Sequence, residues 1–187
     1  PDRTFNNTRD TTAFPKEEVR KVVPMAGVSE RRIADPSTTS TDLCYDAAEA
    51  LLNKLGWSRD SIDGLIMVTQ TPDYFMPSSS CLLHRRLGLA THCAAFDLGL
   101  GCSGYPYGLW LASMMLRTGN LRRVLLLHGE TPTHYASDDD RAVALLFGDA
   151  GSATAQESDA SDDAPHPYFT LHTDGSGYDD LIIEAGG

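Results

Sequence analysis

The residues best suited to covalent chemistry lie in the stretch 93–119, which reads CAAFDLGLGCSGYPYGLWLASMMLRTG. Its first six residues form an apolar run typical of a buried strand, and glycines then stand on both sides of Cys102. The apolar residues that follow predict a helix that ends near Arg117, with Gly119 as its cap. Because glycine permits a tight strand-to-helix turn, this pattern predicts a nucleophile elbow with a cysteine in place of the usual serine.

Cys102 would lie at the amino end of that helix, where unpaired N–H groups and the helix dipole favour a thiolate. The pattern therefore predicts a nucleophile. The alternative is a buried cysteine that serves as a small hydrophobic residue, which is common for free cysteines. A cysteine hydrolase in which Cys102 pairs with His128 or His134 is a further hypothesis, because such partners need not be adjacent in sequence.

Two other segments could bind ions. Three consecutive carboxylates at 138–140 lie near His134, but consecutive carboxylates in a loop are more often solvated, so we expect no bound metal. The glycine-rich segment 148–151 lacks the lysine and the spacing of a phosphate-binding loop. We expect it to be a tight turn between two packed strands, at 142–147 and 150–156.

Length and charge limit the function. The 187 residues suit one domain or half of a larger fold, and a net charge of −11 argues against nucleic acid as a general partner. No apolar run approaches membrane-spanning length, and the polar N-terminus is unlike a signal peptide, so we expect no membrane association. A phosphate-bearing ligand would need local cations, for which the candidates are the arginine pairs 31–32, 85–86 and 122–123, mostly expected to be solvated, and the isolated Arg141.

The four cysteines show neither C-x-x-C spacing nor zinc-like pairing with histidine. Cys44, Cys81 and Cys93 fall among apolar residues and are expected to be core thiols. Free core thiols favour a reducing, cytoplasmic setting.

Helices and strands alternate along the chain after residues 1–20, which are polar and show little periodicity. Apolar periodicity predicts a helix over 43–55, capped by Ser40 or Thr41 and ended by Gly56. Further apolar runs predict buried strands, a short helix at 78–87 and an acidic solvated loop at 157–167; the strands are expected at 64–69, 123–128, 168–172 and 181–184. This alternation predicts an α/β layered architecture with a mostly parallel sheet.

Five motifs, taken together and in order, resemble the β-ketoacyl-acyl-carrier-protein synthase III branch of the thiolase-like condensing enzymes. They are GVSERRIA (27–34), MPSSSC (76–81), DLGLGCSG (97–104), LFGDAGSA (146–153) and HTDGSGYDDL (172–181). The elbow, Arg141 and Phe147 also keep the family's spacing. The resemblance covers roughly residues 20–187 and implies that 1–187 is the N-terminal half of a thiolase-like fold. It further implies that a first strand, central to the sheet, precedes Pro1 and that the second half lies beyond residue 187.

The same resemblance implies an activity. Cys102 would be acylated from an acyl-coenzyme A or an acyl carrier protein, and the acyl group would pass to a malonyl-type extender by decarboxylative Claisen condensation, in fatty acid or polyketide-type synthesis. Arg141 would pair with a phosphate of coenzyme A. Phe147 would lie in the acyl pocket, and Met76 would reach across a homodimer interface into the partner subunit's acyl pocket, where the family often has phenylalanine. A flexible methionine would admit a different or longer chain.

Departures from the family leave alternatives open. The tryptophan and arginine that clasp adenine in the family would fall at Lys21 and Met25, so an acyl carrier protein is an alternative donor to coenzyme A. Coenzyme A or phosphopantetheine would take part only within the substrate, and no separate cofactor is expected. The histidine and asparagine of the second half-reaction are expected beyond residue 187. The alternatives are transfer to an alcohol or amine, and a non-catalytic partner subunit of a condensing heterodimer.

Overall fold

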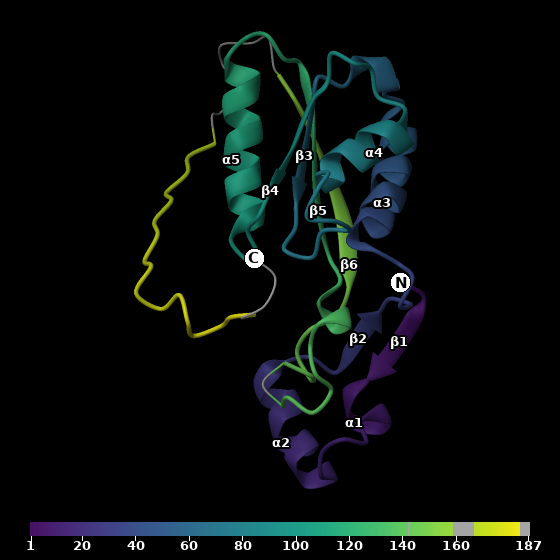
Figure 1. Cartoon of the computed structure of the whole chain (residues 1–187), viewed down its shortest axis with the longest axis vertical. Coiled ribbons are helices and arrows are strands. Elements are labelled where there is room, and N and C mark those ends of the chain that lie inside the picture. Colours follow the sequence, from purple (N-terminus) through teal and green to yellow (C-terminus); the bar gives the residue numbers. More distant parts are fainter. Residues whose placement is uncertain (142, 159–166, 184–187) are drawn as a thin grey trace.

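The computed structural model describes residues 1–141, 143–158 and 167–183. Its centre is a four-stranded sheet (Figure 1) in the order β4-β3-β5-β6. Strand β3 is parallel to both of its neighbours, and only β6 runs antiparallel to β5. The strands are β3 (Gly64–Val68), β4 (Ala94–Leu98), β5 (Arg123–Glu130) and β6 (Ala150–Glu157). The predicted α/β fold with a mostly parallel sheet is confirmed.

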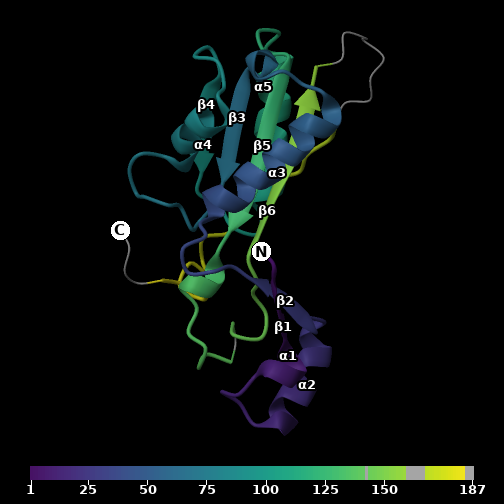
Figure 2. The same cartoon turned by 90° about the vertical axis from the view of Figure 1, so that its right-hand side faces the viewer.

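Helices cover both faces of this sheet (Figures 1 and 2). Helices α3 (Ser40–Leu55) and α4 (Ser79–Leu87) pack on one face, and α5 (Gly104–Arg117) packs on the other. Strand β3 is buried along its whole length, as its continuous apolar run predicted. Alternate β3 side chains enter the two cores, with Leu65 and Met67 on the α3–α4 side and Ile66 and Val68 on the α5 side.

The residues that end α3 and α5 are those predicted, except for the N-cap of α3. Thr39, and not Ser40 or Thr41, caps α3, because its hydroxyl accepts from the Asp42 N–H while the Asp42 carboxylate accepts from the Thr39 N–H. At the end of α5, Gly119 takes a φ of 79° and its N–H donates to the Leu116 carbonyl. Gly119 therefore ends α5 as predicted.

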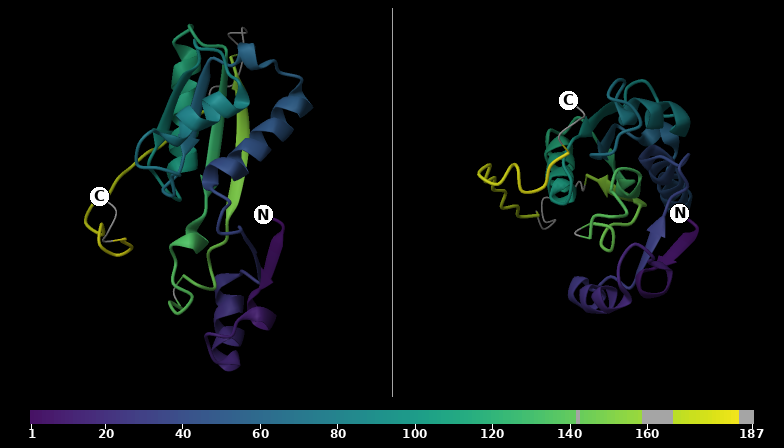
Figure 3. Two further views of the ribbon diagram at one scale, coloured as in Figure 1. Left: turned by 45° about the vertical axis from the view of Figure 1, so that its right-hand side comes forward. Right: turned by 60° about the horizontal axis from the view of Figure 1, so that its bottom comes forward.

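A small N-terminal unit precedes α3. Strands β1 (Arg3–Asn6) and β2 (Glu30–Ile33) pair antiparallel, and α1 (Asn7–Asp10) and α2 (Lys16–Ala26) lie between them in sequence. Figure 3 shows this unit beyond one end of the sheet. The sequence did not predict its two strands, because both are short and polar. Two single 3₁₀ turns, Arg59–Ser61 and Pro132–His134, complete the regular elements of the described residues.

Several predicted strands are wrong. Residues 143–147 form tight turns, in which Val143 and Ala144 donate to the Asp140 carbonyl, and residue 142 lies outside the described residues. The runs 168–172 and 181–183 have no strand pairing, and much of the segment 167–183 is exposed as it passes along the outside of α5 (Figure 3). An apolar run without a neighbouring strand cannot form sheet. Residue 184 and residues 159–166 of the expected acidic loop lie outside the described residues, while Glu157 belongs to β6.

The predicted central position of a preceding strand is also wrong. Strands β3 and β5 pair directly over five residues, from Gly64 with Val124 to Val68 with His128. The four strands therefore form a continuous sheet with no vacant place at its centre.

Candidate active site

The loops that carry the predicted site residues leave the sheet at one end. Val68 lies opposite both Leu98 and His128, so the carboxyl ends of three parallel strands coincide. The loops that leave this end are 69–78, 99–103 and 131–149, and they carry Met76, Cys102, Arg141 and Phe147. In sheets of this kind, ligands bind outside the carboxyl ends of the strands.

Glycines lie on both sides of Cys102 in the elbow. A Cβ at Gly101 would overlap the side chain of Gln70, and a Cβ at Gly104 would overlap Val68 of β3. One turn further along α5, a Cβ at Gly108 would lie 2.5 Å from Leu126 Cδ1. Glycine at positions 104 and 108 lets α5 approach the sheet closely, whereas a Cβ at position 101 would meet only the flexible end of the Gln70 side chain.

Cys102 is exposed at the mouth of this turn, directly before Ser103, the N-cap residue of α5. The Gly104 N–H donates to the Gly101 carbonyl at 2.8 Å and closes the turn. Within the described part of the chain, the N–H groups of Cys102 and Ser103 have no acceptor. These two donors beside an exposed thiol can stabilise negative charge that develops on a substrate oxygen.

The other cysteines differ from Cys102 in their surroundings. Burial raises the pKa of Cys44 to about 12 and that of Cys93 to about 11, so both stay protonated at neutral pH. These two are core thiols, as predicted. The prediction is wrong for Cys81, which is exposed in the first turn of α4 and accepts a hydrogen bond from the Ser78 hydroxyl.

A cysteine–histidine pair is not assembled. Within the described residues no hydrogen bond joins Cys102 to His128 or His134. The His128 ring instead stacks on Tyr105 of α5, with ring centroids 6.4 Å apart and planes inclined by 13°. The described residues therefore do not support the hydrolase hypothesis.

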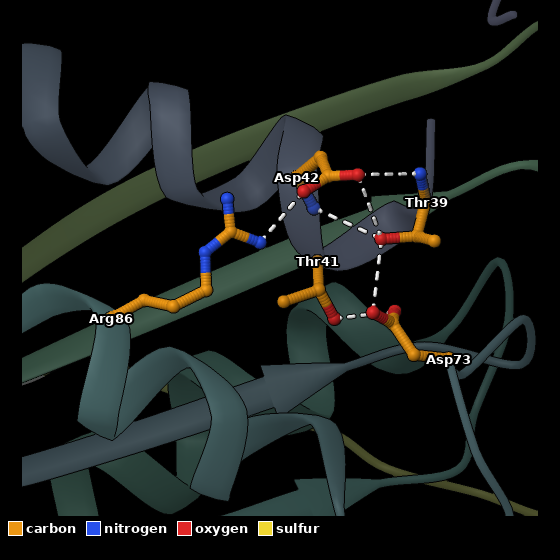
Figure 4. A network of polar contacts seen from close by, with 5 residues as sticks. All are labelled: Thr39, Thr41, Asp42, Asp73 and Arg86. Atoms are coloured by element: carbon orange, nitrogen blue, oxygen red, sulfur yellow. Dashed lines mark hydrogen bonds and ion pairs between the residues drawn. The ribbon is translucent and has the colours of Figure 1, made fainter. Parts of the chain in front are cut away.

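Met76 lies on a loop that is anchored at both ends. At one end, Asp73 accepts hydrogen bonds from the Thr39 and Thr41 hydroxyls at 3.0 and 2.6 Å (Figure 4). At the other end, Asp97 of β4 accepts from the N–H groups of Ser79 and Ser80 at the start of α4. These two bonds are 2.7 and 2.8 Å long.

Met76 itself is 86% exposed, so the loop presents an apolar side chain from a fixed base. At the start of the same loop, Glu130 at the end of β5 accepts hydrogen bonds from the Gln70 N–H and the Thr71 hydroxyl. The loops that follow β3 and β5 are therefore joined at the end of the sheet that carries Cys102.

Arg141 and Phe147 lie further along the loop after β5. Arg141 is exposed, and its guanidinium donates to the Glu18 carboxylate of α2 at 2.9 Å. Phe147 is half-buried beside a cleft of about 380 Å³ between this loop and the N-terminal unit. Cys102 does not line that cleft, so the described residues place Phe147 and the thiol at one end of the sheet but not in one cavity.

The carboxylates that hold these loops were not predicted from the sequence. Asp97 and Glu130 lie in or at the end of apolar strands, and Asp149 follows the run 143–147. A charged residue that interrupts or ends an apolar run is the one signal that could have identified them.

Two classes of site are absent from the described residues. No group of three or more His, Cys, Asp or Glu side chains there could hold a metal ion. No helix found in the described ranges is both long and apolar enough to cross a membrane.

Comparison with known proteins decides the family. Residues 96–175, which include the elbow, match the family model of 3-oxoacyl-[acyl-carrier-protein (ACP)] synthase III. A β-ketoacyl-[acyl-carrier-protein] synthase III of Alkalilimnicola ehrlichii is 42% identical over 156 residues, which are 83% of this chain and 47% of that protein. The chain belongs to the β-ketoacyl-acyl-carrier-protein synthase III family. It corresponds to the N-terminal half of a synthase III.

Further relatives of synthase III agree over the whole chain. The enzyme of Desulfitobacterium hafniense is 34% identical over 188 residues, which cover 100% of this chain and 56% of that protein. The solved 3-oxoacyl-(acyl-carrier protein) synthase of Burkholderia xenovorans superposes with a TM-score of 0.91 at 42% identity. That match covers 100% of this chain and 53% of the other. The chain thus spans about half the length of the relatives it matches, and the thiolase-like fold of these synthases is confirmed.

Proposed function

We propose that this chain is the acyl-accepting half of a condensing enzyme that forms β-ketoacyl thioesters. The observation that supports this role is the exposed Cys102 thiol in a glycine-rich elbow, beside two backbone N–H groups that have no acceptor among the described residues. The exposed thiol of Cys102 is open to a thioester, whereas the buried thiols of Cys44 and Cys93 are not.

In the first step, the Cys102 thiolate attacks the carbonyl carbon of an acyl thioester. The N–H groups of Cys102 and Ser103 stabilise the oxyanion, and the donor's sulfur then leaves as a thiolate that takes up a proton. In the second step, a malonyl-type extender loses carbon dioxide, and its carbanion attacks the Cys102 thioester and frees the thiol. The histidine and asparagine that promote this second step in the family are expected beyond residue 187.

The donor carries either coenzyme A or an acyl carrier protein. Arg141 supplies the positive charge for a phosphate at the edge of the site, and Phe147 contributes to the acyl pocket. On α2, Lys21 and Met25 are both exposed and cannot reproduce an adenine clasp of tryptophan and arginine. This favours the acyl carrier protein as the donor, in a cytoplasmic setting.

The protein also forms a homodimer in this proposal. Strand β4 lies at the edge of the sheet, with partly exposed apolar residues along it and only β3 as a partner in the described structure. A second copy of β4 could pair with this edge about a twofold axis. Met76, exposed nearby on its anchored loop, would then enter the partner's acyl pocket.

Intact-protein and peptide mass spectrometry tests the acylation. The full-length enzyme is incubated with acyl-coenzyme A and with acyl-carrier-protein donors of several lengths, beside Cys102→Ala and Cys81→Ala. We expect an acyl adduct on the Cys102 peptide in the native and Cys81→Ala proteins and none in Cys102→Ala. Cys81→Ala is the matched control because it removes the other exposed thiol. The absence of an adduct from a folded sample with every donor would overturn the proposal and favour a non-catalytic partner subunit.

A further inference from the structure

A buried carboxylate lies where the N-terminal unit meets the loop 131–149. Asp149 is only 2% exposed, and its carboxylate accepts hydrogen bonds from two separate segments. The Ala34 N–H, just after β2, donates to Oδ2 at 2.7 Å, and the Thr133 N–H donates to Oδ1 at 3.1 Å. The Thr133 hydroxyl also donates to Oδ2. One carboxylate thus fixes both ends of the loop 131–149 to the strand that precedes α3.

Arg31 makes the second connection between the same two segments. Its guanidinium donates to the Phe147 carbonyl at 2.8 Å and to the Asn7 side-chain oxygen at 2.7 Å. Burial lowers the pKa of Arg31, while the carboxylates of Asp138 and Asp149 act in the opposite direction. Most such arginines were expected to be solvated, but Arg31 lies over the Phe5 ring and donates to the loop 131–149.

Asn7 makes a third connection at the junction, by which we mean the contact between the N-terminal unit and the loop 131–149. Its side chain is fully buried, and its amide donates to the Leu145 carbonyl at 2.8 Å and to the Val28 carbonyl at 2.9 Å. Arg31 and Asn7 therefore hydrogen-bond to each other and to backbone carbonyls on both sides of the junction, while Asp149 accepts separately from Ala34 and Thr133. Such a network is costly to break, because a partner left buried without a hydrogen bond loses its solvation.

The loop held by this junction carries both residues that the proposed function assigns to donor binding. Phe147 is two residues from Asp149 and is contacted by Arg31, and Arg141 lies between the two attachment points at Thr133 and Asp149. Cys102 lies on a different loop, and no hydrogen bond among the described residues joins it to Asn7, Arg31 or Asp149. A change at the junction should therefore move the donor-binding residues without disturbing the thiol.

We infer that Asp149 is a positioning residue that sets the affinity of this site for the acyl donor, by fixing the loop 131–149 against β2 through Thr133 and Ala34. This inference rests on the proposed function for its kinetic consequence. Its structural consequence, the rigidity of the loop, can be measured without any activity.

Asp149→Asn tests the inference, because the amide keeps the shape but replaces one acceptor oxygen with an NH2 donor, so it cannot accept the three hydrogen bonds that reach Oδ1 and Oδ2. Asp63→Asn is the matched control. Asp63 also accepts two backbone N–H groups, from Arg122 and Arg123, but lies at the opposite end of the sheet. Amide hydrogen exchange over 131–149 and the kinetics of Cys102 acylation are measured for each full-length protein.

We expect Asp149→Asn to speed exchange in the loop at least tenfold and to raise KM for the acyl donor at least fivefold. The maximal rate of Cys102 acylation should stay within twofold, and Asp63→Asn should change none of the three. Thr133→Val removes one hydroxyl that donates to Asp149. It should speed exchange and raise KM by smaller factors than Asp149→Asn, and it serves as the test if Asp149→Asn does not fold.

Unchanged exchange in folded Asp149→Asn or, if that variant does not fold, in Thr133→Val would overturn the inference. So would a fall in the maximal rate with an unchanged KM. If the native protein accepts no acyl group from any donor, the proposed function fails. Faster exchange in the variant would then still support the role of Asp149 in fixing the loop.

Discussion

The guanidinium of Arg141 donates to the carboxylate of Glu18 across 2.9 Å, so the cation proposed to bind the donor's phosphate already has an acidic partner on α2. Both side chains are about half exposed. An ion pair of this kind contributes at most about 1 kcal/mol, so a phosphate can displace the carboxylate. Glu18 thus lowers the positive charge that a phosphate would meet.

Glu18→Gln should therefore strengthen the binding of acyl donors that place a phosphate at Arg141. We expect KM for acyl-coenzyme A to fall by up to about fivefold, the equivalent of the roughly 1 kcal/mol that the pair contributes. Glu17→Gln, on the same turn of α2, removes the same charge without an ion pair to Arg141 and is the control. If both variants lower KM equally, the cause is the loss of one negative charge from α2 and not the loss of the ion pair between Glu18 and Arg141.

Gly104→Ala should destabilise the fold and disturb the elbow. The new methyl group would overlap Val68, whose branched side chain is buried in β3, and overpacking of this kind costs about 1–3 kcal/mol. Chemical denaturation measures the loss, and the rate of Cys102 acylation should fall in the same protein. Gly99→Ala is the matched control, because a Cβ there meets nothing within 4 Å. A stable Gly104→Ala protein would show that α5 does not lie as close to β3 as described.

The four cysteines should react with alkylating agents in two groups. Cys81 and Cys102 are exposed, whereas Cys44 and Cys93 are buried and their pKa values are raised. At pH 7.5 we expect iodoacetamide to modify the exposed pair and to leave the buried pair intact until denaturant is added. Peptide mass spectrometry reports each site. Early modification of Cys44 in folded protein would contradict the core position of that thiol.

The raised pKa of Cys44 predicts a loss of stability in alkali. The free thiol has a pKa near 8.5 in the unfolded chain, and burial raises it to about 12 in the folded protein. Protonated Cys44 makes its full contribution to the free energy of unfolding below about pH 8.5. This contribution is lost as the pH rises toward 12, because the thiol ionises in the unfolded chain before it ionises in the folded protein. At pH 10 the free energy of unfolding is therefore lower by about 2 kcal/mol than at neutral pH.

Urea denaturation at pH 7.5 and pH 10 can measure this loss. Cys44→Ala should lower stability at pH 7.5 but show a smaller further fall at pH 10 than the native protein. Cys81→Ala, which removes an exposed thiol, should keep the native pH dependence. The same pH dependence in all three proteins would contradict the assignment.

Asp73→Ala should release the base of the Met76 loop. The change removes the acceptor of the Thr41 hydroxyl, and a hydroxyl left without a partner costs about 1 kcal/mol or more. The Thr39 hydroxyl also loses its bond to Asp73 but keeps its contacts with Asp42. Hydrogen exchange over 70–78 should become faster, and discrimination between acyl chains should weaken if Met76 lines the partner's pocket. Asp46→Ala removes a carboxylate from the outer side of α3 and serves as control. Unchanged exchange over 70–78 would show that Glu130 and Asp97 hold the loop without Asp73.

Met76→Phe tests the chain-length role directly. A bulkier and more rigid side chain at the tip of this loop should shift the preference toward shorter acyl donors. Competition between donors of different length, read from the adducts on Cys102, measures the shift. An unchanged preference would show that Met76 does not reach an acyl chain.

The sequence by itself determined the elements whose residues interact locally. The run 64–69 had to be a strand buried on both faces, Gly56 and Gly119 had to end their helices, and the glycines around Cys102 specified the elbow. The motif order also determined the family. These features depend on backbone conformation and on apolar periodicity, which neighbouring residues set.

The tertiary structure alone decided the rest. Asn7, Arg31 and Asp149 are ordinary polar residues in the sequence, and only the packing of the N-terminal unit on the loop 131–149 buries them together. Cys81 is exposed, and the apolar runs at 168–172 and 181–183 form no strand, because burial and strand pairing need a surface that other parts of the chain supply. The loops that carry Met76, Cys102, Arg141 and Phe147 likewise leave the sheet at one end only because the parallel strands end together.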